Sequence, residues 1–199
     1  ILVGNWFLTT PDPSGIGDGF DFGHLLTGNI RRIEVLRGSN SVVHGSQAIG
    51  GVVNLMTATP EAGFAGRASA EYGYSDTVNA KADLSGSAGA VSGGIGGAYF
   101  RTDGISSAAV GTERDGYKNF AGNARLKIAF SDALSLDLRG YYINADLDCD
   151  SFFGAPADSG DVAKLDQYIG YAGLNLGLFD GRFTSRAAVT WMRNERDYF

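Results

Sequence analysis

The chain has 199 residues, a net charge of -6 and 30 glycines, about twice the ordinary share of glycine. The acidic balance excludes the basic surface that nucleic-acid binding requires, and so much glycine argues against a mainly helical domain. The single cysteine, Cys149, excludes an intrachain disulfide framework, and no apolar run approaches the roughly 18 residues of a membrane helix. Any membrane crossing must therefore be made by strands.

The first part of the chain has a short apolar run followed by a loop. The run ILVGNW is followed by Pro11, Pro13 and several glycines, which predict a loop. The glycine-rich stretch GIGDGFDFG matches neither a Walker loop nor GxGxxG, and no helical pattern follows it. We therefore expect no phosphate-binding loop here.

Residues 31–57 predict a strand, a tight elbow and a second strand. Ile33 and Val35 alternate with charged neighbours, which is typical of a strand, and Gly38 ends it. A serine, Ser39 or Ser41, can cap a short helical turn that ends at His44. An extended run from 52 to 57 follows two glycines. This unit is too small to fold alone.

From residue 64 onward the chain alternates between apolar and polar residues with a period of two. In the clearest segment, Leu126 and Ile128 alternate with Arg125 and Lys127. One face of such a sheet can meet lipid while the other meets a wet lumen, and we expect Leu126, Leu136, Leu174 and Trp191 to share the outward face. The expected strands cover 65–74, 78–89, 91–102, 118–130, 134–147, 166–178 and 183–197.

Strand length and connection length favour a membrane sheet over a soluble β-sandwich. Sandwich strands usually have about 5 or 6 residues, whereas the expected strands have ten or more. Tight turns near 89–90, 131–133 and 180–181 alternate with long connections at 102–117 and 148–165. Bacterial barrels have short periplasmic turns and long outer loops, so we expect the first strand to start at the periplasmic side.

The segments RIEVLRG and AIGGVVNLMT identify a family. They resemble the end of the plug domain of TonB-dependent outer-membrane receptors, although Gly38-Ser39 replaces the usual Gly-Pro and His44-Gly45 the usual Tyr-Gly. The resemblance implies an all-β fold located in the bacterial outer membrane. The expected domains are the C-terminal part of a plug, 1–60, and the first strands of a large barrel of the 22-stranded type, 61–199.

Seven strands cannot close around a plug, and an open sheet would leave unpaired edges in lipid. We therefore expect the sequence to be truncated at both ends. We expect the signal peptide, the energy-coupling Ton box, the first part of the plug and most of the barrel to lie outside it.

The resemblance implies uptake of a scarce nutrient, driven by a TonB partner through the plug. The segment DPSGIGDGFDFGHLLTGNI is similar to the vitamin B12 receptor branch, so cobalamin is the expected ligand, with a ferric siderophore as the alternative. A passive porin or an adhesin would lack the plug segment. We expect no enzyme, because His24 and His44 have no local nucleophile or ligand spacing and fit hydrogen-bonding roles in the plug.

Charged residues on the first plug strand form one candidate site. Arg32, Glu34 and Arg37 can be an ordinary solvated face, but the resemblance implies that they pair with charges on the barrel wall and hold the plug through polar, wet packing.

Acidic residues in the long loops form a second candidate, a calcium site. A hairpin turn centred on Asp132 pairs Leu126 with Leu138 and Lys127 with Asp137, although it also sets Arg125 against Arg139. The same register brings Asp115 opposite Cys149 and Glu113 opposite Ser151. Crowded carboxylates favour a hard cation, and the resemblance also implies calcium in these loops. A solvated acidic loop is the alternative, and DLDCD is not an EF-hand. The expected ligands are Glu113, Asp115, Asp148, Asp150 and Asp161.

Overall fold

A computed structural model describes residues 2–3, 6–7, 22–26, 30–44, 48–57, 63–106, 113–149 and 160–199. These residues form two sheets, one of four strands in the order β2-β1-β4-β3 and one of seven strands in the order β11-β10-β9-β8-β7-β6-β5. The expected all-β fold, with a plug segment followed by about seven antiparallel strands, is confirmed. The expected domain boundary falls within residues 58–62, which lie outside the described residues.

The first sheet contains the predicted strand, elbow and strand. They are β3 (Ile30–Arg37), the single helical turn α1 (Ser41–His44) and β4 (Gly51–Thr57). Gly38 ends β3 with a φ of 90°, a conformation that favours glycine, and Asn40 N donates to Ala48 O at 2.8 Å across the elbow. Gly51 has no room for a side chain, because a Cβ there would lie 2.6 Å from Leu36 O.

Two very short strands and a turn of 3-10 helix complete this part. β1 (Leu2–Val3) pairs in parallel with β4 and antiparallel with β2 (Trp6–Phe7). The 3-10 turn η1 covers Phe22–His24. Among the residues that the structure describes, no helix has the length and apolar character that a membrane crossing needs.

The second sheet is an antiparallel meander in which every strand pairs with the next one in the chain. The predicted boundaries hold within a few residues except at β10. That strand begins at Asp161 rather than near 166, because its pairing with β9 continues to Cys149. The strands are β5 (Gly63–Gly73), β6 (Thr77–Ala88), β7 (Val91–Thr102), β8 (Tyr117–Ala129), β9 (Leu134–Cys149), β10 (Asp161–Leu178) and β11 (Phe183–Tyr198).

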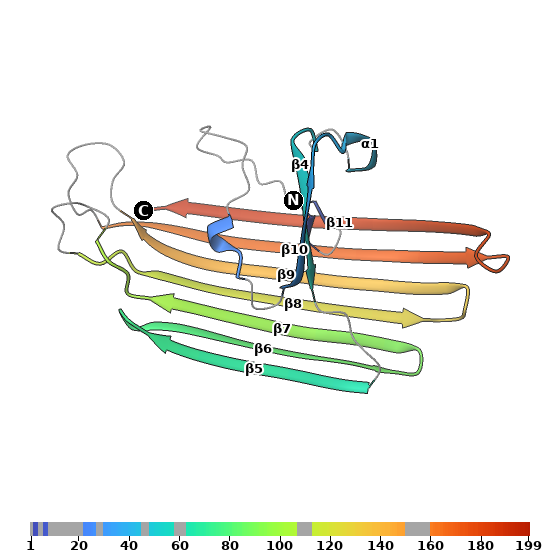
Figure 1. Ribbon diagram of the computed structural model, residues 1–199, viewed down its shortest axis with the longest axis horizontal. Helices are drawn as coiled ribbons and strands as arrows, with labels where there is room; N and C mark the ends of the chain where they lie inside the picture. The colour runs from blue at the N-terminus through green and yellow to red at the C-terminus, as the bar shows by residue number, and fades with distance from the viewer. Residues whose placement is uncertain are drawn as a thin grey trace.

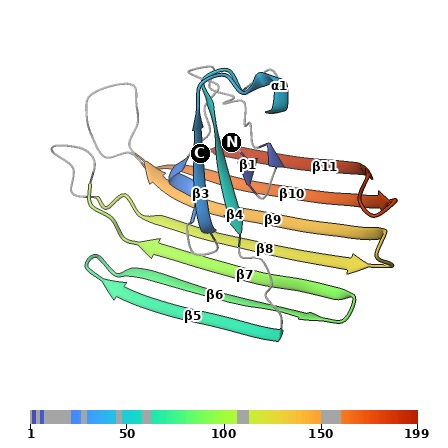
Figure 2. The ribbon, with the colours of Figure 1, turned by 45° about the vertical axis from the view of Figure 1, so that its right-hand side comes forward.

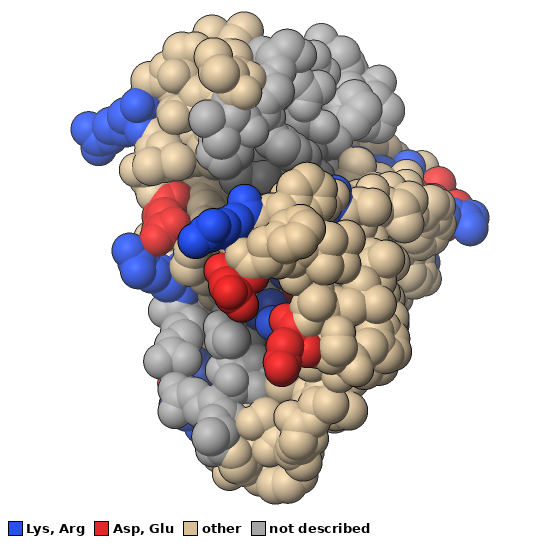
Figure 3. Space-filling model, turned by 90° about the vertical axis from the view of Figure 1, so that its right-hand side faces the viewer, with Lys and Arg blue, Asp and Glu red and all other residues tan. Residues whose placement is uncertain are grey.

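The register of the strands separates an outward from an inward face. Leu136 pairs with Leu174, Leu126 with Leu138 and Trp191 with Gly170, so these side chains leave the sheet on one side. Tyr141 and Ile143 alternate with them and lie on the other side, which carries the buried cluster. The predicted outward face is confirmed. Figure 3 shows a broad surface without charged side chains beside the charged inner region.

Connections of different length lie at opposite ends of the sheet (Figure 1). The turns between β6 and β7, β8 and β9, and β10 and β11 are tight and share one end. The connections after β7 and β9 are long and share the other end. This alternation matches the short periplasmic turns and longer outer loops of bacterial barrels.

The hairpin of β3 and β4 crosses the inward face of the large sheet at a steep angle, as both ribbon views show (Figures 1 and 2). β4 carries the buried side chains Val52 and Leu55. On β3, by contrast, Ile33 and Val35 are exposed. Val52 packs with Ala48 in the elbow, whereas Leu55 joins a buried cluster with residues of the large sheet, called the wall below, and Ile30 of β3 and Val53 of β4 pack against that cluster.

Candidate functional site

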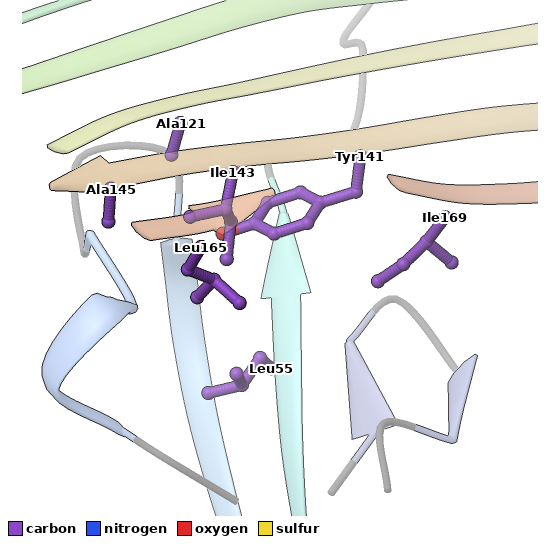
Figure 4. Close-up of a cluster of buried hydrophobic side chains, with 7 residues drawn as sticks. All are labelled: Leu55, Ala121, Tyr141, Ile143, Ala145, Leu165 and Ile169. Carbon is purple, nitrogen blue, oxygen red and sulfur yellow. The ribbon is translucent and has the colours of Figure 1, made fainter. Parts of the chain in front are cut away.

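The contact between the hairpin and the wall is centred on an apolar cluster. Leu55 of β4 is 1% exposed and points toward Leu165 and Ile143 (Figure 4). Fully burying one leucine side chain contributes roughly 1.5–3 kcal/mol. The buried members are Leu55, Ala121, Tyr141, Ile143, Ala145, Leu165 and Ile169.

A polar network beside this cluster joins η1 to β8. Asn119, 1% exposed, donates from Nδ2 to the His24 carbonyl oxygen at 2.8 Å and to the Tyr117 hydroxyl at 2.6 Å. The Tyr117 hydroxyl donates to Gly23 O at 3.1 Å and lies 2.9 Å from His24 Nδ1. Two wall side chains therefore bind consecutive residues of the plug. The expected hydrogen-bonding role of His24 is observed, whereas the side chain of His44 lies outside the described residues.

A second polar network lies on the inward face nearer the short turns. Asp137 is only 5% exposed and accepts hydrogen bonds from Arg139, with Nε at 2.9 Å, while Arg125 Nη2 lies 3.5 Å away. The Arg139 guanidinium carbon is 5.0 Å from the centre of the Tyr171 ring. The predicted pairings of Lys127 with Asp137 and of Arg125 with Arg139 are both observed. The two arginines tolerate one another because both contact Asp137.

Two of the charged residues predicted to hold the plug, Arg32 and Glu34, pair with each other. Arg32 Nη2 lies 2.8 Å from Glu34 Oε1, and Asn54 Nδ2 donates to Glu34 Oε2 at 3.2 Å. The first contact lies within β3, and the second connects β3 with β4 inside the small sheet. Contact of Arg32, Glu34 and Arg37 with barrel charges therefore stays a prediction. The described contact between plug and wall combines an apolar cluster with the polar network of Tyr117 and Asn119, and the expected polar, wet packing stays a prediction.

The acidic residues predicted to bind calcium lie at the end with the long connections. Asp148 N donates to Gly116 O at 2.9 Å, which continues the predicted register toward Asp115, and Asp161 pairs with Cys149. Strand alternation sends the side chains of Asp148 and Asp161 to opposite faces. Within the described ranges no three acidic, histidine or cysteine side chains are grouped closely enough to hold a metal ion. Asp150 lies outside those ranges.

Comparison with known proteins decides the family. The protein-family model of the TonB-dependent receptor plug domain matches residues 9–52 of the sequence. The vitamin B12 transporter BtuB of Photobacterium profundum is 31% identical over 187 residues, which cover 89% of this chain and 30% of that protein. The chain belongs to the TonB-dependent receptors. It is a protein of the bacterial outer membrane, and it spans about a third of the length of this relative.

Solved receptors share the fold. The siderophore receptor PiuA from Acinetobacter baumannii aligns with a TM-score of 0.71 at 16% identity, covering 86% of this chain and 27% of PiuA. The siderophore receptor PirA from Pseudomonas aeruginosa aligns with a TM-score of 0.65 at 21% identity, covering 98% of this chain and 32% of PirA. At these identities the likeness concerns the fold alone.

The sequence prediction missed the residues that hold the plug of this receptor against its wall. The sequence predicted charged residues of β3 for this role, but Leu55, Tyr117 and Asn119 make the described contacts between plug and wall. One signal was available, because Tyr141, Tyr142 and Ile143 interrupt the alternation with consecutive apolar residues. A strand with apolar residues on both faces is buried on both, here by lipid outside and by the plug inside.

Proposed function

We propose that the complete receptor takes up a scarce nutrient across the outer membrane, with cobalamin as the ligand and a TonB complex supplying the energy. The vitamin B12 transporter BtuB supports this choice, since it is 31% identical along 89% of the chain. A ferric siderophore is the second candidate, because the aligned solved structures include receptors for such ligands. Their identities of 16% and 21% give this alternative less support.

The observation that carries the proposal is the hairpin docked on the inward face of a sheet whose other face is apolar. Passage through such a barrel requires the plug to leave its place or to rearrange. The described contact consists of one compact apolar cluster and one polar network. The described part of this interface can open as a unit, because the large sheet keeps its own hydrogen bonds when the hairpin moves.

Ligand binding by the purified full-length receptor tests the choice of substrate. Cyanocobalamin should bind, and ferric siderophores of the catecholate and hydroxamate classes should not. Uptake of radiolabelled cyanocobalamin by cells should require TonB. If a ferric siderophore binds tightly and cyanocobalamin does not, the cobalamin assignment fails while the family assignment stands.

We further propose that Glu113, Asp115, Asp150 and Asp161 hold a calcium ion that orders the outer loops, with Asp148 as a further ligand. The continued register of β8, β9 and β10 supports this, because it brings Asp115 and Asp161 to either side of Cys149. Carboxylate oxygens are the ligands that calcium prefers. Asp148 has the least support, since its side chain leaves the sheet on the outward face.

Calorimetric titration of the full-length receptor with calcium tests this site. Asp161→Asn should weaken calcium binding at least tenfold. Asp132→Asn, in a tight turn at the opposite end, is the matched control and should bind calcium normally. Cyanocobalamin affinity should fall when a chelator is added. Unchanged calcium affinity in Asp161→Asn would remove this residue from the site, and unchanged cobalamin affinity with chelator would remove the ion from the mechanism.

A further inference from the structure

The outward face of β7 and β8 changes from aromatic to basic within one pair of residues. Tyr99 pairs with Phe120, and these side chains are 38% and 44% exposed on the outward face. The next outward pair toward the long connections is Arg101 with Lys118. Both basic side chains are exposed. Like charges directly opposite one another on neighbouring strands repel, and Asp103 and Asp146 offset this repulsion only from the sides of the pair.

These two residues line a pocket of about 280 Å³. Arg114 brings a third cation, and Gly116 leaves space in the wall of the pocket, since a Cβ there would lie 2.8 Å from Asp148 Oδ2. The carboxylate of Asp103 lies 3.0 Å from Arg101 Nη2 through Oδ1 and 3.9 Å from Arg114 Nη1 through Oδ2. Asp146 on β9 pairs in register with Lys118. The charged residues that line the pocket are Arg101, Arg114, Lys118, Asp103, Asp146 and Asp148.

The pocket lies where the apolar outward band ends. Counted from the tight turns, the first charged residue on the outward face of β11 is Arg193. The strand pairings place Arg193 level with Gly97 on β7, and Gly97 is four residues before Arg101. An offset of four residues along the strands, accumulated over the four spacings from β11 to β7, corresponds to strands tilted by about 35° from the barrel axis. Membrane barrel strands are tilted by about this amount, so the edge of the charged region follows the membrane surface. Arg101 and Lys118 therefore lie at the level of the outer lipid headgroups.

We propose that this pocket binds the phosphate group of a phosphorylated glycolipid in the outer leaflet. An arginine side chain can bind a phosphate through two parallel hydrogen bonds, and Lys118 adds a point charge beside it. The ion pair of Arg101 with Asp103 is exposed and weak enough for a phosphate to compete with it. The acyl chains lie against Tyr99, Phe120 and the apolar surface below them, which continues into a hollow of about 580 Å³ bordered by Ile95 and Leu126.

The charge balance of the pocket favours a lipid over a free anion. Its three cations are matched by three carboxylates, so the pocket attracts free phosphate only weakly. An amphiphile is retained by its chains as well, and the basic pair then selects the phosphate at its head. The position of the pocket at the edge of the apolar band supplies both contacts at once.

Native mass spectrometry of the full-length receptor with diphosphorylated lipid A tests the proposal. The unmodified receptor should retain the lipid, whereas Arg101→Gln with Lys118→Gln should lower its occupancy at least tenfold. Arg114→Gln alone should lower it less. Lys81→Gln, which removes an exposed cation on the inward face, is the matched control and should retain the lipid fully. Heat-modified migration on gels checks that each variant is folded.

Two further arms distinguish the lipid from a free ion. Lipid A from which the phosphates have been removed should bind no better to the receptor than to the double variant. Inorganic phosphate at the same concentration should leave occupancy unchanged. Equal occupancy in the double variant, equal binding of the dephosphorylated lipid, or displacement by inorganic phosphate would each overturn the proposal.

Discussion

The side-chain amide of Asn119 lies 2.8 Å from the carbonyl oxygen of His24, so a buried wall residue holds the plug by its main chain. The same amide donates to Tyr117, whose hydroxyl donates to Gly23. These two acceptors are main-chain oxygens, and the His24 ring adds a side-chain contact with the Tyr117 hydroxyl. The network therefore fixes where the plug lies without requiring a salt bridge.

Asn119→Ala should loosen this contact. The change leaves the His24 carbonyl without its donor from β8, which costs about 1–3 kcal/mol for a buried group. Hydrogen exchange of residues 22–26 in the full-length receptor should therefore become about tenfold or more faster. Asn79→Ala on β6 removes a marginal 3.5 Å contact with Glu71 and is the control. Equal exchange in the two variants would contradict a role for Asn119.

Leu55→Ala should destabilise the docked hairpin by about 2–5 kcal/mol, because it leaves a cavity among buried side chains. Leu36→Ala on the neighbouring strand should cost much less, since Leu36 is 44% exposed. The destabilisation in each variant is measured by urea titration of the receptor in detergent, with hydrogen exchange within β4 as the readout. If the two variants lose equal protection, the apolar cluster is not the centre of the contact.

Asp137→Asn should destabilise the wall by about 3–5 kcal/mol. Arg125 and Arg139 would then face each other and Lys127 without the carboxylate that separates them. Glu195→Gln breaks an ion pair that is exposed on the outward face and should change stability little. The free energy of unfolding in lipid vesicles measures the difference. A stable Asp137→Asn receptor would show that another anion neutralises the arginines.

The two faces of the sheet predict opposite responses to arginine. Ala82→Arg introduces a charge in the middle of β6 on the lipid side, which costs roughly 2–4 kcal/mol at the membrane midplane. Asn79→Arg lies on the inward face of the same strand, near Glu71, and should be tolerated. The folded fraction after insertion into vesicles reports both. Equal folding of the two variants would contradict the assignment of the faces.

The strand pattern could be predicted because it depends on local alternation. Lys127 against Asp137 and Leu126 against Leu138 followed from one tight turn, since a short hairpin sets its own register. The start of β10 was misplaced, because the sequence DVAKL has little alternation and becomes a strand only by pairing with the upper part of β9. Pairing between strands overrides weak local preference there.

The candidate sites were harder to predict than the strands. Contact between Leu55 and Ile143 joins residues far apart in the chain, and no local pattern states which inward residues the plug covers. Charged residues such as Arg32 and Glu34 stand out in a sequence, yet they pair with each other on one strand. Buried uncharged groups such as Asn119 carry more of the described contact and give a weaker sequence signal.

From β7 to β11, the edge of the apolar band on the outward face shifts by about one residue per strand relative to the strand pairing. This shift constrains how such a sheet can close into a barrel. After one full circuit, the last strand is displaced along the first by about as many residues as there are strands. The displacement must be even, because an odd one would join inward to outward residues at the seam. Every strand of this sheet is also antiparallel to its neighbours, so a closed barrel that keeps this pairing at the seam can gain or lose only whole hairpins, and its circumference changes in steps of two strands.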